Sequence, residues 1–294
     1  MGAPVRRNAW GEAPDPDPVR TFIAARTAQV GIPAAAALGA LAPALPPGAL
    51  LPTVLGGGAA VAAGLSAYFV ATFFPRSSFG HPLLVRLPAG AGADAVALTF
   101  DDGPHPETTP RLLDLLAAHE ARATFFLVGE RASQFPALAR RIADEGHALG
   151  AHGLRHQAMV LTPPAQLARE LSEARARIEE ASGRGLGEEP WLRPPHGFKT
   201  WRLCRTATRL GWRLAAWSVD PRDYDREVTA GVLARRMTSR IGPGDVVLLH
   251  ERPGVSAVTD ALPAVLAWGR GGGLRFVALP PPRSSHAPVG LSRP

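Results

Sequence analysis

The stretch Ala95–Pro104 reads AVALTFDDGP and decides the fold. A short apolar run followed at once by polar residues and Gly-Pro is typical of a buried strand that ends in a loop. Six further apolar runs recur along the chain, with amphipathic helical stretches between most of them. The seven predicted strands lie at Ala95–Phe100, Ala123–Val128, Ala148–Ala151, Trp191–Arg193, Leu214–Val219, Val246–Leu249 and Arg275–Leu279. The main predicted helices lie at Pro110–His119, Gln134–Glu145, Pro164–Ala181, Thr200–Leu210, Val228–Arg240 and Ala257–Trp268.

An alternation of strand and helix repeated about seven times predicts an α/β fold, with a parallel sheet and helices outside it. At this number of repeats, a closed or nearly closed β/α barrel is the expected architecture. We expect this domain to occupy residues 93–280, after a linker at 76–92 and before a C-terminal tail at 281–294.

Polar clusters follow five of the predicted strands at their C-terminal ends, the rim where β/α barrels assemble their active sites. Asp101 and Asp102 come directly after the first predicted strand. Two adjacent carboxylates repel each other, so a folded protein needs a reason to hold them together. An ordinary turn or helix cap would explain one aspartate. A pair at this rim favours a metal ligand beside a general base.

His152 and His156 are four residues apart, which would place both imidazoles on one face of a helical turn. That spacing lets both rings reach one divalent ion at about 2.0–2.1 Å, although an isolated pair with this spacing is more often solvated. Together with one aspartate, the two histidines make three protein ligands and leave a position for water. This is the arrangement of a catalytic site of the zinc type.

Three later segments add candidate catalytic groups. In Arg193–Gly197 (RPPHG), two prolines would hold the arginine where it can orient a carboxylate, with backbone N–H groups beyond them for an oxyanion. Asp220 and Asp223 offer carboxylates that could hydrogen-bond a histidine and set its pKa. A Pro-rich loop and a surface turn are the ordinary alternatives for these segments. His250 ends a buried strand, where a general acid explains it better than a core residue.

Taken in order, these segments resemble the five motifs of the polysaccharide deacetylase family (the NodB-homology domain, carbohydrate esterase family four). The resemblance covers roughly Ala93–Leu279, and the TFDDGP stretch at Thr99–Pro104 is its most specific part. It implies a distorted barrel of about seven β/α units, of (β/α)7 type, that binds a divalent metal ion, with zinc expected and cobalt as the alternative.

The resemblance also implies a role for each matching residue. The implied roles are general base for Asp101, metal ligand for Asp102, His152 and His156, orientation of Asp101 for Arg193, general acid for His250, tuning of that acid for Asp223, and lining of the acetyl pocket for Leu248 and Tyr224. The backbone N–H near His196 would hold the oxyanion.

Four positions depart from the family pattern. Gly153 replaces the usual Ser or Thr between the histidines, so a supporting hydroxyl is missing, and Glu251 replaces the usual Asp after the acid histidine. His196 stands where a tyrosine is usual, and Tyr224 stands where a tryptophan is usual. None of these changes removes a catalytic group, but together they leave the substrate open.

The region Thr27–Pro75 contains no charged residue, which is unusual for a soluble protein of this size. We expect one or two membrane helices, or a helical hairpin, within residues 27–75, after a polar Pro-rich tail at 1–26. The two candidate spans are Ala28–Leu45 and Leu50–Phe74. A signal peptide and a buried core hairpin are the alternatives.

Orientation in the membrane depends on the number of spans. Arginines flank both ends of the uncharged region, so two spans would place the catalytic domain in the cytoplasm by the positive-inside rule. A single span at Leu50–Phe74 would place it outside, where wall polysaccharides lie. Because wall polysaccharides lie outside, we expect a location at the cell membrane with the catalytic domain facing outward and the lipid bilayer as a partner.

The composition narrows the class of partner. The formal net charge of +7 favours anionic partners such as a phospholipid surface or an acidic wall polymer. Arginines and acidic residues are interspersed along the predicted helices, and no basic run alternates with aromatic residues, so nucleic-acid binding is not expected. Cys204 is the only cysteine, which excludes an internal disulfide and a cysteine-rich zinc site.

These observations predict a metal-dependent hydrolase that removes N-acetyl groups from amino-sugar residues of a polysaccharide, either peptidoglycan or a chitin-like glycan. One alternative is a deacylase or deformylase of a lipid-linked amino sugar. A second alternative is a catalytically inactive sugar-binding module tethered to the membrane.

Overall fold

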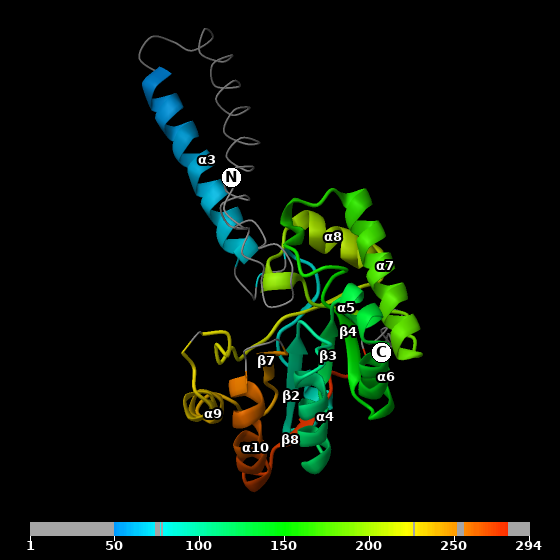
Figure 1. Cartoon of the computed structure of the whole chain (residues 1–294). Coiled ribbons are helices and arrows are strands. Elements are labelled where there is room, and N and C mark those ends of the chain that lie inside the picture. The colour runs from blue at the N-terminus through cyan, green and yellow to red at the C-terminus, as the bar shows by residue number, and fades with distance from the viewer. Residues whose placement is uncertain (1–49, 74–76, 78, 226, 252–255, 282–294) are drawn as a thin grey trace, which may run out of the picture.

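A curved parallel sheet surrounded by helices forms the body of the protein in the computed structural model, which describes residues 50–73, 77, 79–225, 227–251 and 256–281 (Figure 1). The strands are β1 (Leu83–Leu84), β2 (Ala95–Asp101), β3 (Thr124–Leu127), β4 (Ala148–Ala151), β5 (Trp191–Leu192), β6 (Arg213–Ala215), β7 (Val246–His250) and β8 (Arg275–Val277). The α-helices are α3 (Leu50–Phe73), α4 (Thr108–Ala118), α5 (Gly129–Gln134), α6 (Pro136–Asp144), α7 (Pro164–Ser182), α8 (Trp201–Arg209), α9 (Ala230–Thr238) and α10 (Ser256–Gly271). Short 3-10 turns lie at Ala89–Ala91, Met159–Leu161 and Pro195–Gly197.

The strands run in the order β1-β6-β5-β4-β3-β2-β7, all parallel, with β8 also paired to β2. A parallel bridge between Val219 and Val247 joins the chain after β6 to β7, so the sheet bends back on itself. This nearly closed arrangement matches the predicted distorted (β/α)7 barrel. Because the strands are parallel, their C-terminal ends meet at one rim.

Each of the seven predicted strands overlaps one of β2 to β8, and each predicted main helix overlaps an observed one. The structure adds β1, which lies in the segment 76–92 expected to be a linker. Leu83 and Leu84 pair with Leu214 and Ala215 of β6. Two half-buried residues are too few to produce an alternating pattern, so the sequence alone does not reveal this strand.

The core lies between the sheet and its helices. Every residue of β2 is buried, as expected for a central parallel strand that is covered on both faces. Two of the covering helices begin at threonine N-caps: Thr200 accepts a hydrogen bond from Leu203 N, and Thr229 accepts one from Val232 N. These caps explain why α8 and α9 start where they do.

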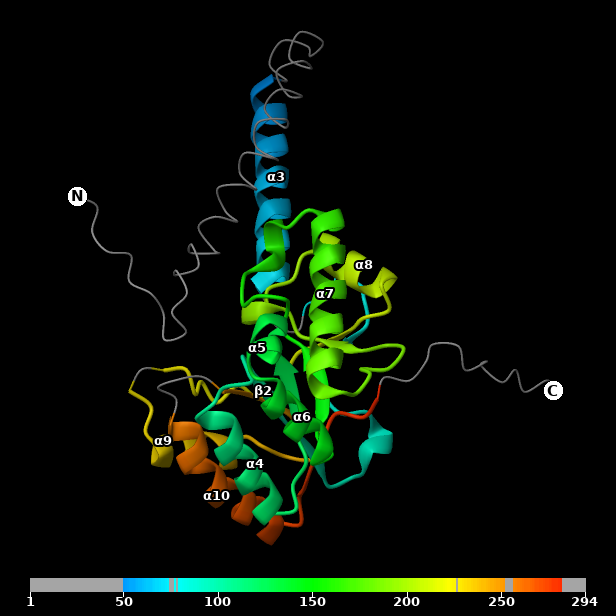
Figure 2. The ribbon, with the colours of Figure 1, turned by 45° about the vertical axis from the view of Figure 1, so that its right-hand side comes forward.

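Helix α3 extends away from the barrel, and its last turn reaches the rim (Figures 1 and 2). There, Lys199 N donates a hydrogen bond to Thr72 O (3.0 Å). Among the residues whose structure is described, no helix combines the length and apolar character that a membrane span needs, so the span expected at Leu50–Phe74 and the lipid partner are not supported. The other expected span, Ala28–Leu45, lies outside the described residues.

The tail at 1–26 and residues 282–294 also lie outside the described residues. The outward orientation of the catalytic domain stays a prediction.

Candidate active site

A pocket of about 340 Å³ opens at the rim formed by the C-terminal ends of β2, β4 and β7. Eight of the ten predicted site residues line it, and the other two, Arg193 and Asp223, lie behind it in contact with lining residues. The lining residues are Asp101, Asp102, His152, His156, His196, Gly197, Trp217, Asp220, Tyr224, Leu248 and His250. The structure therefore brings all the predicted site residues together.

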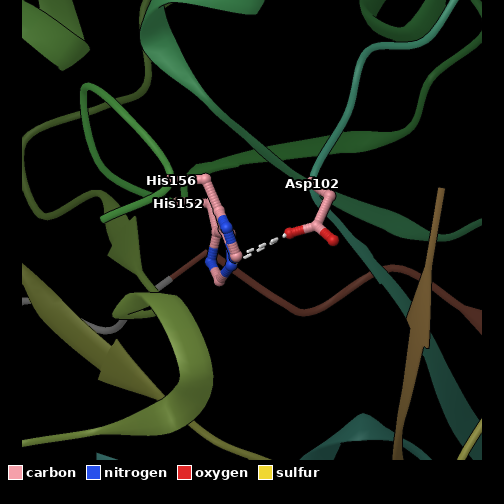
Figure 3. Close-up of side chains that lie close together, drawn as sticks. All are labelled: Asp102, His152 and His156. Carbon is pink, nitrogen blue, oxygen red and sulfur yellow. Dashed lines mark ion pairs between the residues drawn. The ribbon is translucent and has the colours of Figure 1, made fainter. Parts of the chain in front are cut away.

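Asp102, His152 and His156, which all line this pocket, converge on one another (Figure 3). Asp102 Oδ1 lies 3.4 Å from His152 Nε2 and 3.1 Å from His156 Nε2, and one ligand atom from each residue lies within 4.8 Å of the other two. Asp102 Oδ1 is buried and takes part in no hydrogen bond within the described part of the chain. A buried carboxylate oxygen that faces two imidazole nitrogens fits a divalent metal ion.

The local backbone that presents these ligands differs from the expected helical turn. His152 to His156 follow β4 as an irregular loop, because Gly153 adopts a left-handed conformation (φ 88°). A Cβ at Gly153 would also lie 3.0 Å from the backbone oxygen of Arg155, so the Ser or Thr usual in the family would be strained at this position. His152 is held instead through Nδ1, which lies 2.8 Å from the carbonyl oxygen of Arg193.

The electrostatics of these three residues favour the ligand forms that a metal requires. Burial lowers the pKa of His156 to about 3, so its imidazole is neutral at physiological pH. Burial alone would raise the pKa of Asp102, but the neighbouring His156 and His152 hold it well below its usual range. The carboxylate is therefore ionised and the imidazole of His156 has a free electron pair.

Asp101 lies on one side of the metal-ligand cluster and is held by Arg193. Arg193 is fully buried, and its Nη1 donates hydrogen bonds to Asp101 Oδ1 and to Thr99 Oγ1, both at 2.8 Å. Its Nη2 donates to Ala216 O (2.8 Å), and its guanidinium lies 4.1 Å from the ring centre of Phe126. These contacts hold the Asp101 carboxylate in one orientation.

His250 also lines the pocket, on the strand β7 next to β2 and in register with Asp101, and it is held by Asp223. Asp223 Oδ1 lies 2.8 Å from His250 Nδ1, and Asp223 Oδ2 accepts a hydrogen bond from His250 N (2.7 Å). Burial alone would lower the pKa of His250, but the Asp223 carboxylate raises it to about 9. The imidazole is therefore a cation at neutral pH, the form that a general acid needs.

The mouth of the pocket carries the remaining predicted residues. His196 has a left-handed backbone (φ 58°), and its ring lies against that of His156 with 4.7 Å between centroids. Tyr224 is 40% exposed and donates a hydrogen bond from its hydroxyl to Asp220 Oδ2 (3.0 Å). Leu248 lines the pocket wall and is buried.

Sequence reasoning missed several residues around this site. Trp217 lines the pocket, and its place within the predicted strand Leu214–Val219 was the only signal for it. Arg131 is buried and donates a hydrogen bond to Asp102 O (2.6 Å), a contact that no sequence spacing suggests. Glu251, which the sequence marked only as a departure from the family pattern, is fully buried, and burial raises its pKa to about 8.

Comparison with known proteins finds relatives among polysaccharide deacetylases. The family model described as polysaccharide deacetylase matches residues 89–215. A peptidoglycan-N-acetylglucosamine deacetylase of Bacillus cereus is 37% identical over 188 residues, which are 63% of this chain and 66% of that protein. A chitooligosaccharide deacetylase of Azorhizobium caulinodans is 32% identical over 157 residues, which cover 53% of this chain and 73% of that protein.

A solved structure extends the agreement to the fold. The crystal structure of a peptidoglycan N-acetylglucosamine deacetylase superimposes with a TM-score of 0.63 at 32% sequence identity. The match covers 68% of this chain and 92% of that chain. The similarity therefore extends over nearly the whole of that chain.

Proposed function

Because the chain belongs to the polysaccharide deacetylase family, we propose that it is a metal-dependent hydrolase that removes N-acetyl groups from amino-sugar residues of a polysaccharide. The substrate class is peptidoglycan or a chitin-like glycan, because the similar proteins carry the names of peptidoglycan-N-acetylglucosamine and chitooligosaccharide deacetylases. One observation carries the proposal: a single pocket holds the cluster of Asp102, His152 and His156 together with a candidate base and a candidate acid.

Asp102, His152 and His156 would hold the metal. Two imidazoles and one carboxylate suit zinc, with cobalt as the alternative, and three protein ligands leave room for water and substrate. When bound, the ion would supply Lewis acidity toward the amide carbonyl and would make water a stronger acid.

Asp101 is the proposed general base. Its carboxylate faces the pocket with one oxygen held by Arg193, and its other oxygen, Oδ2, lies 3.9 Å from His152 Nε2. That oxygen would accept a proton from the attacking water. Arg193 would stop the carboxylate from turning away while it does so.

His250 is the proposed general acid. The bond to Asp223 occupies Nδ1 and leaves Nε2 to donate a proton to the leaving nitrogen of the sugar. Without that proton the amine would leave as an unstable anion. The raised pKa of His250 keeps the proton available at neutral pH.

Substrate contacts would come from the mouth of the pocket. The backbone N–H near His196 would donate to the oxyanion, a role that does not depend on the side chain and so tolerates histidine in place of tyrosine. Leu248 and Tyr224 would line the space for the acetyl methyl group, next to His250.

Acetate release tests this function. The purified full chain, loaded with zinc, is expected to release acetate from N-acetylglucosamine oligomers or from peptidoglycan. Treatment with a chelator should stop the release, and added zinc or cobalt should restore it. Stoichiometric zinc binding without acetate release from any amino-sugar polymer would favour the inactive sugar-binding module, and release only from a lipid-linked amino sugar would favour that alternative substrate.

A further inference from the structure

The turn that carries Asp102 has an unusual backbone. Asp102 adopts a left-handed conformation (φ 76°), which residues other than glycine adopt routinely only when their surroundings hold them there. The direction of its Cα–Cβ bond, and therefore the position of Oδ1, depends on this conformation. A ligand on such a turn needs support from outside the turn.

Three successive carbonyl groups of this turn each accept one hydrogen bond, and each bond comes from a different element. Glu251 N donates to Asp101 O (2.9 Å), and Val128 N donates to Gly103 O (2.9 Å). Between them, the Nη1 of Arg131 donates to Asp102 O (2.6 Å). The middle bond is the only one of the three that comes from a side chain, so it is the one that a substitution can remove.

The space under the turn is tightly filled. A Cβ on Gly103 would lie 1.4 Å from the Oε1 atom of Glu251, so this carboxyl group fits there only because residue 103 is glycine. Glu251 Oε2 accepts a hydrogen bond from Thr109 Oγ1 (2.6 Å), which in turn accepts one from His105 N (2.7 Å). The turn is thus held from below by β7 and α4, and from the side by Arg131 of α5.

Burial of a guanidinium at this place costs free energy of folding. Arg131 is only 3% exposed, and arginine is rarely buried to this extent without a specific role. Its bond to Asp102 O restrains the peptide that follows Asp102 and so limits the rotation that would carry Oδ1 away from the imidazoles of His152 and His156. Groups that hold metal ligands in this way contribute to affinity without touching the metal.

We propose that Arg131 is a positioning residue for the metal site, fixing the left-handed Asp102 so that its carboxylate meets the two histidines. This inference rests on the proposed metal site and adds a residue outside its ligands. Arg131 belongs to none of the sequence motifs. Its contact with Asp102 forms only when α5 packs beside the end of β2, so the sequence alone does not reveal it.

Zinc affinity of the metal-free protein tests the proposal without depending on turnover. The wild-type chain, Arg131→Met and Arg131→Lys would be stripped with a chelator and titrated with zinc by calorimetry. We expect Arg131→Met to bind zinc about 10–100-fold more weakly, the range found when groups that support metal ligands are removed. Arg131→Lys keeps one donor and should lose less affinity.

Arg213→Met is the matched control. Arg213 is partly buried and donates to Glu189 Oε1 (2.6 Å), but it lies at the start of β6, at the end of the barrel opposite the pocket. Its removal should lower the unfolding temperature and leave zinc affinity unchanged. Thermal unfolding of each metal-free variant ensures that only folded protein is titrated, and Arg131→Lys carries the test if Arg131→Met does not fold.

Two results would contradict the proposal in different ways. Wild-type zinc affinity in both Arg131 variants would show that Arg131 does not position Asp102, and the proposed function would stand. No zinc binding by the wild-type chain would remove the metal site itself, and the proposed function together with this inference.

Discussion

The two walls of the pocket differ in how far they are exposed. What we call the base wall is Asp101 with Arg193 behind it, both buried and joined by a direct ion pair. What we call the acid wall is His250, Tyr224 and Asp220 with Asp223 behind them, and it runs from the buried Asp223 to a tyrosine that is 40% exposed.

We expect the buried residues of the pocket to carry out the reaction and the exposed residues to contact the substrate. On the base wall Arg193 donates hydrogen bonds to Asp101, Thr99 and Ala216, so a substitution disturbs both the fold and the reaction. On the acid wall the outer residues face the solvent, and there the chain departs from its family with Tyr224. We therefore expect effects of substitution to decrease from the base wall to the outer acid wall.

The largest expected effect is that of Asp101→Asn. An amide cannot accept the proton of water, so kcat should fall by about 10²–10⁴-fold, the usual contribution of a general base. Acetate release measures the loss, and zinc calorimetry checks that the metal ligands still bind. Full activity in a variant that retains its zinc would refute the role of Asp101.

Arg193→Met should show that the base wall also stabilises the fold. The change leaves the buried Asp101 carboxylate without its partner, which costs about 3–5 kcal/mol of unfolding free energy in comparable buried pairs. Urea denaturation measures it. The control is Arg177→Met, which breaks an exposed pair with Glu173 and should cost less than about 1 kcal/mol. Equal losses in the two variants would contradict the distinction between buried and exposed pairs.

Asp223→Asn should change the pH dependence of kcat/KM more than it changes the fold. Asp223 raises the pKa of His250 from 6.5 to about 9, and the acid acts only while protonated, so wild-type kcat/KM should fall as pH rises through about 9. Without the carboxylate, this alkaline limb should move to lower pH by about 1–3 pH units, as expected for loss of one adjacent opposite charge.

The same pair links stability to pH. Because the folded-state pKa of His250 is raised, the stabilisation is fully present below pH about 6.5 and is lost as pH rises through about 9.

The kinetic measurement also has a contradicting outcome. An unchanged alkaline limb of kcat/KM in Asp223→Asn would mean that another group supplies the proton.

The smallest expected effect is that of Tyr224→Phe on the outer acid wall. This change removes the hydrogen bond to Asp220, and one such bond contributes about 0.5–1.5 kcal/mol, or roughly two- to tenfold in kcat/KM. Steady-state kinetics on N-acetylglucosamine oligomers measure it. A loss comparable to that of Asp101→Asn would place Tyr224 among the catalytic groups and abolish the contrast between the walls.

Much of this molecule could be predicted from local patterns. The apolar runs identified seven of the strands, because a buried parallel strand needs consecutive apolar residues wherever it lies in the chain. The polar residues after those runs identified the pocket, because strand ends meet at one rim. The span expected at Leu50–Phe74 shows the limit of the same reasoning, since an uncharged stretch alone does not establish a helix that spans a bilayer.

The sequence by itself determined which residue types stand at the ends of the strands, and therefore what chemistry the rim can perform. Only the tertiary structure decided how they meet. Arg193 reaches Asp101 across 92 residues, Gly153 turns the expected helical turn into a loop, and Arg131 binds a backbone carbonyl of Asp102. Such contacts depend on the packing of distant elements, and neither spacing nor periodicity carries that information.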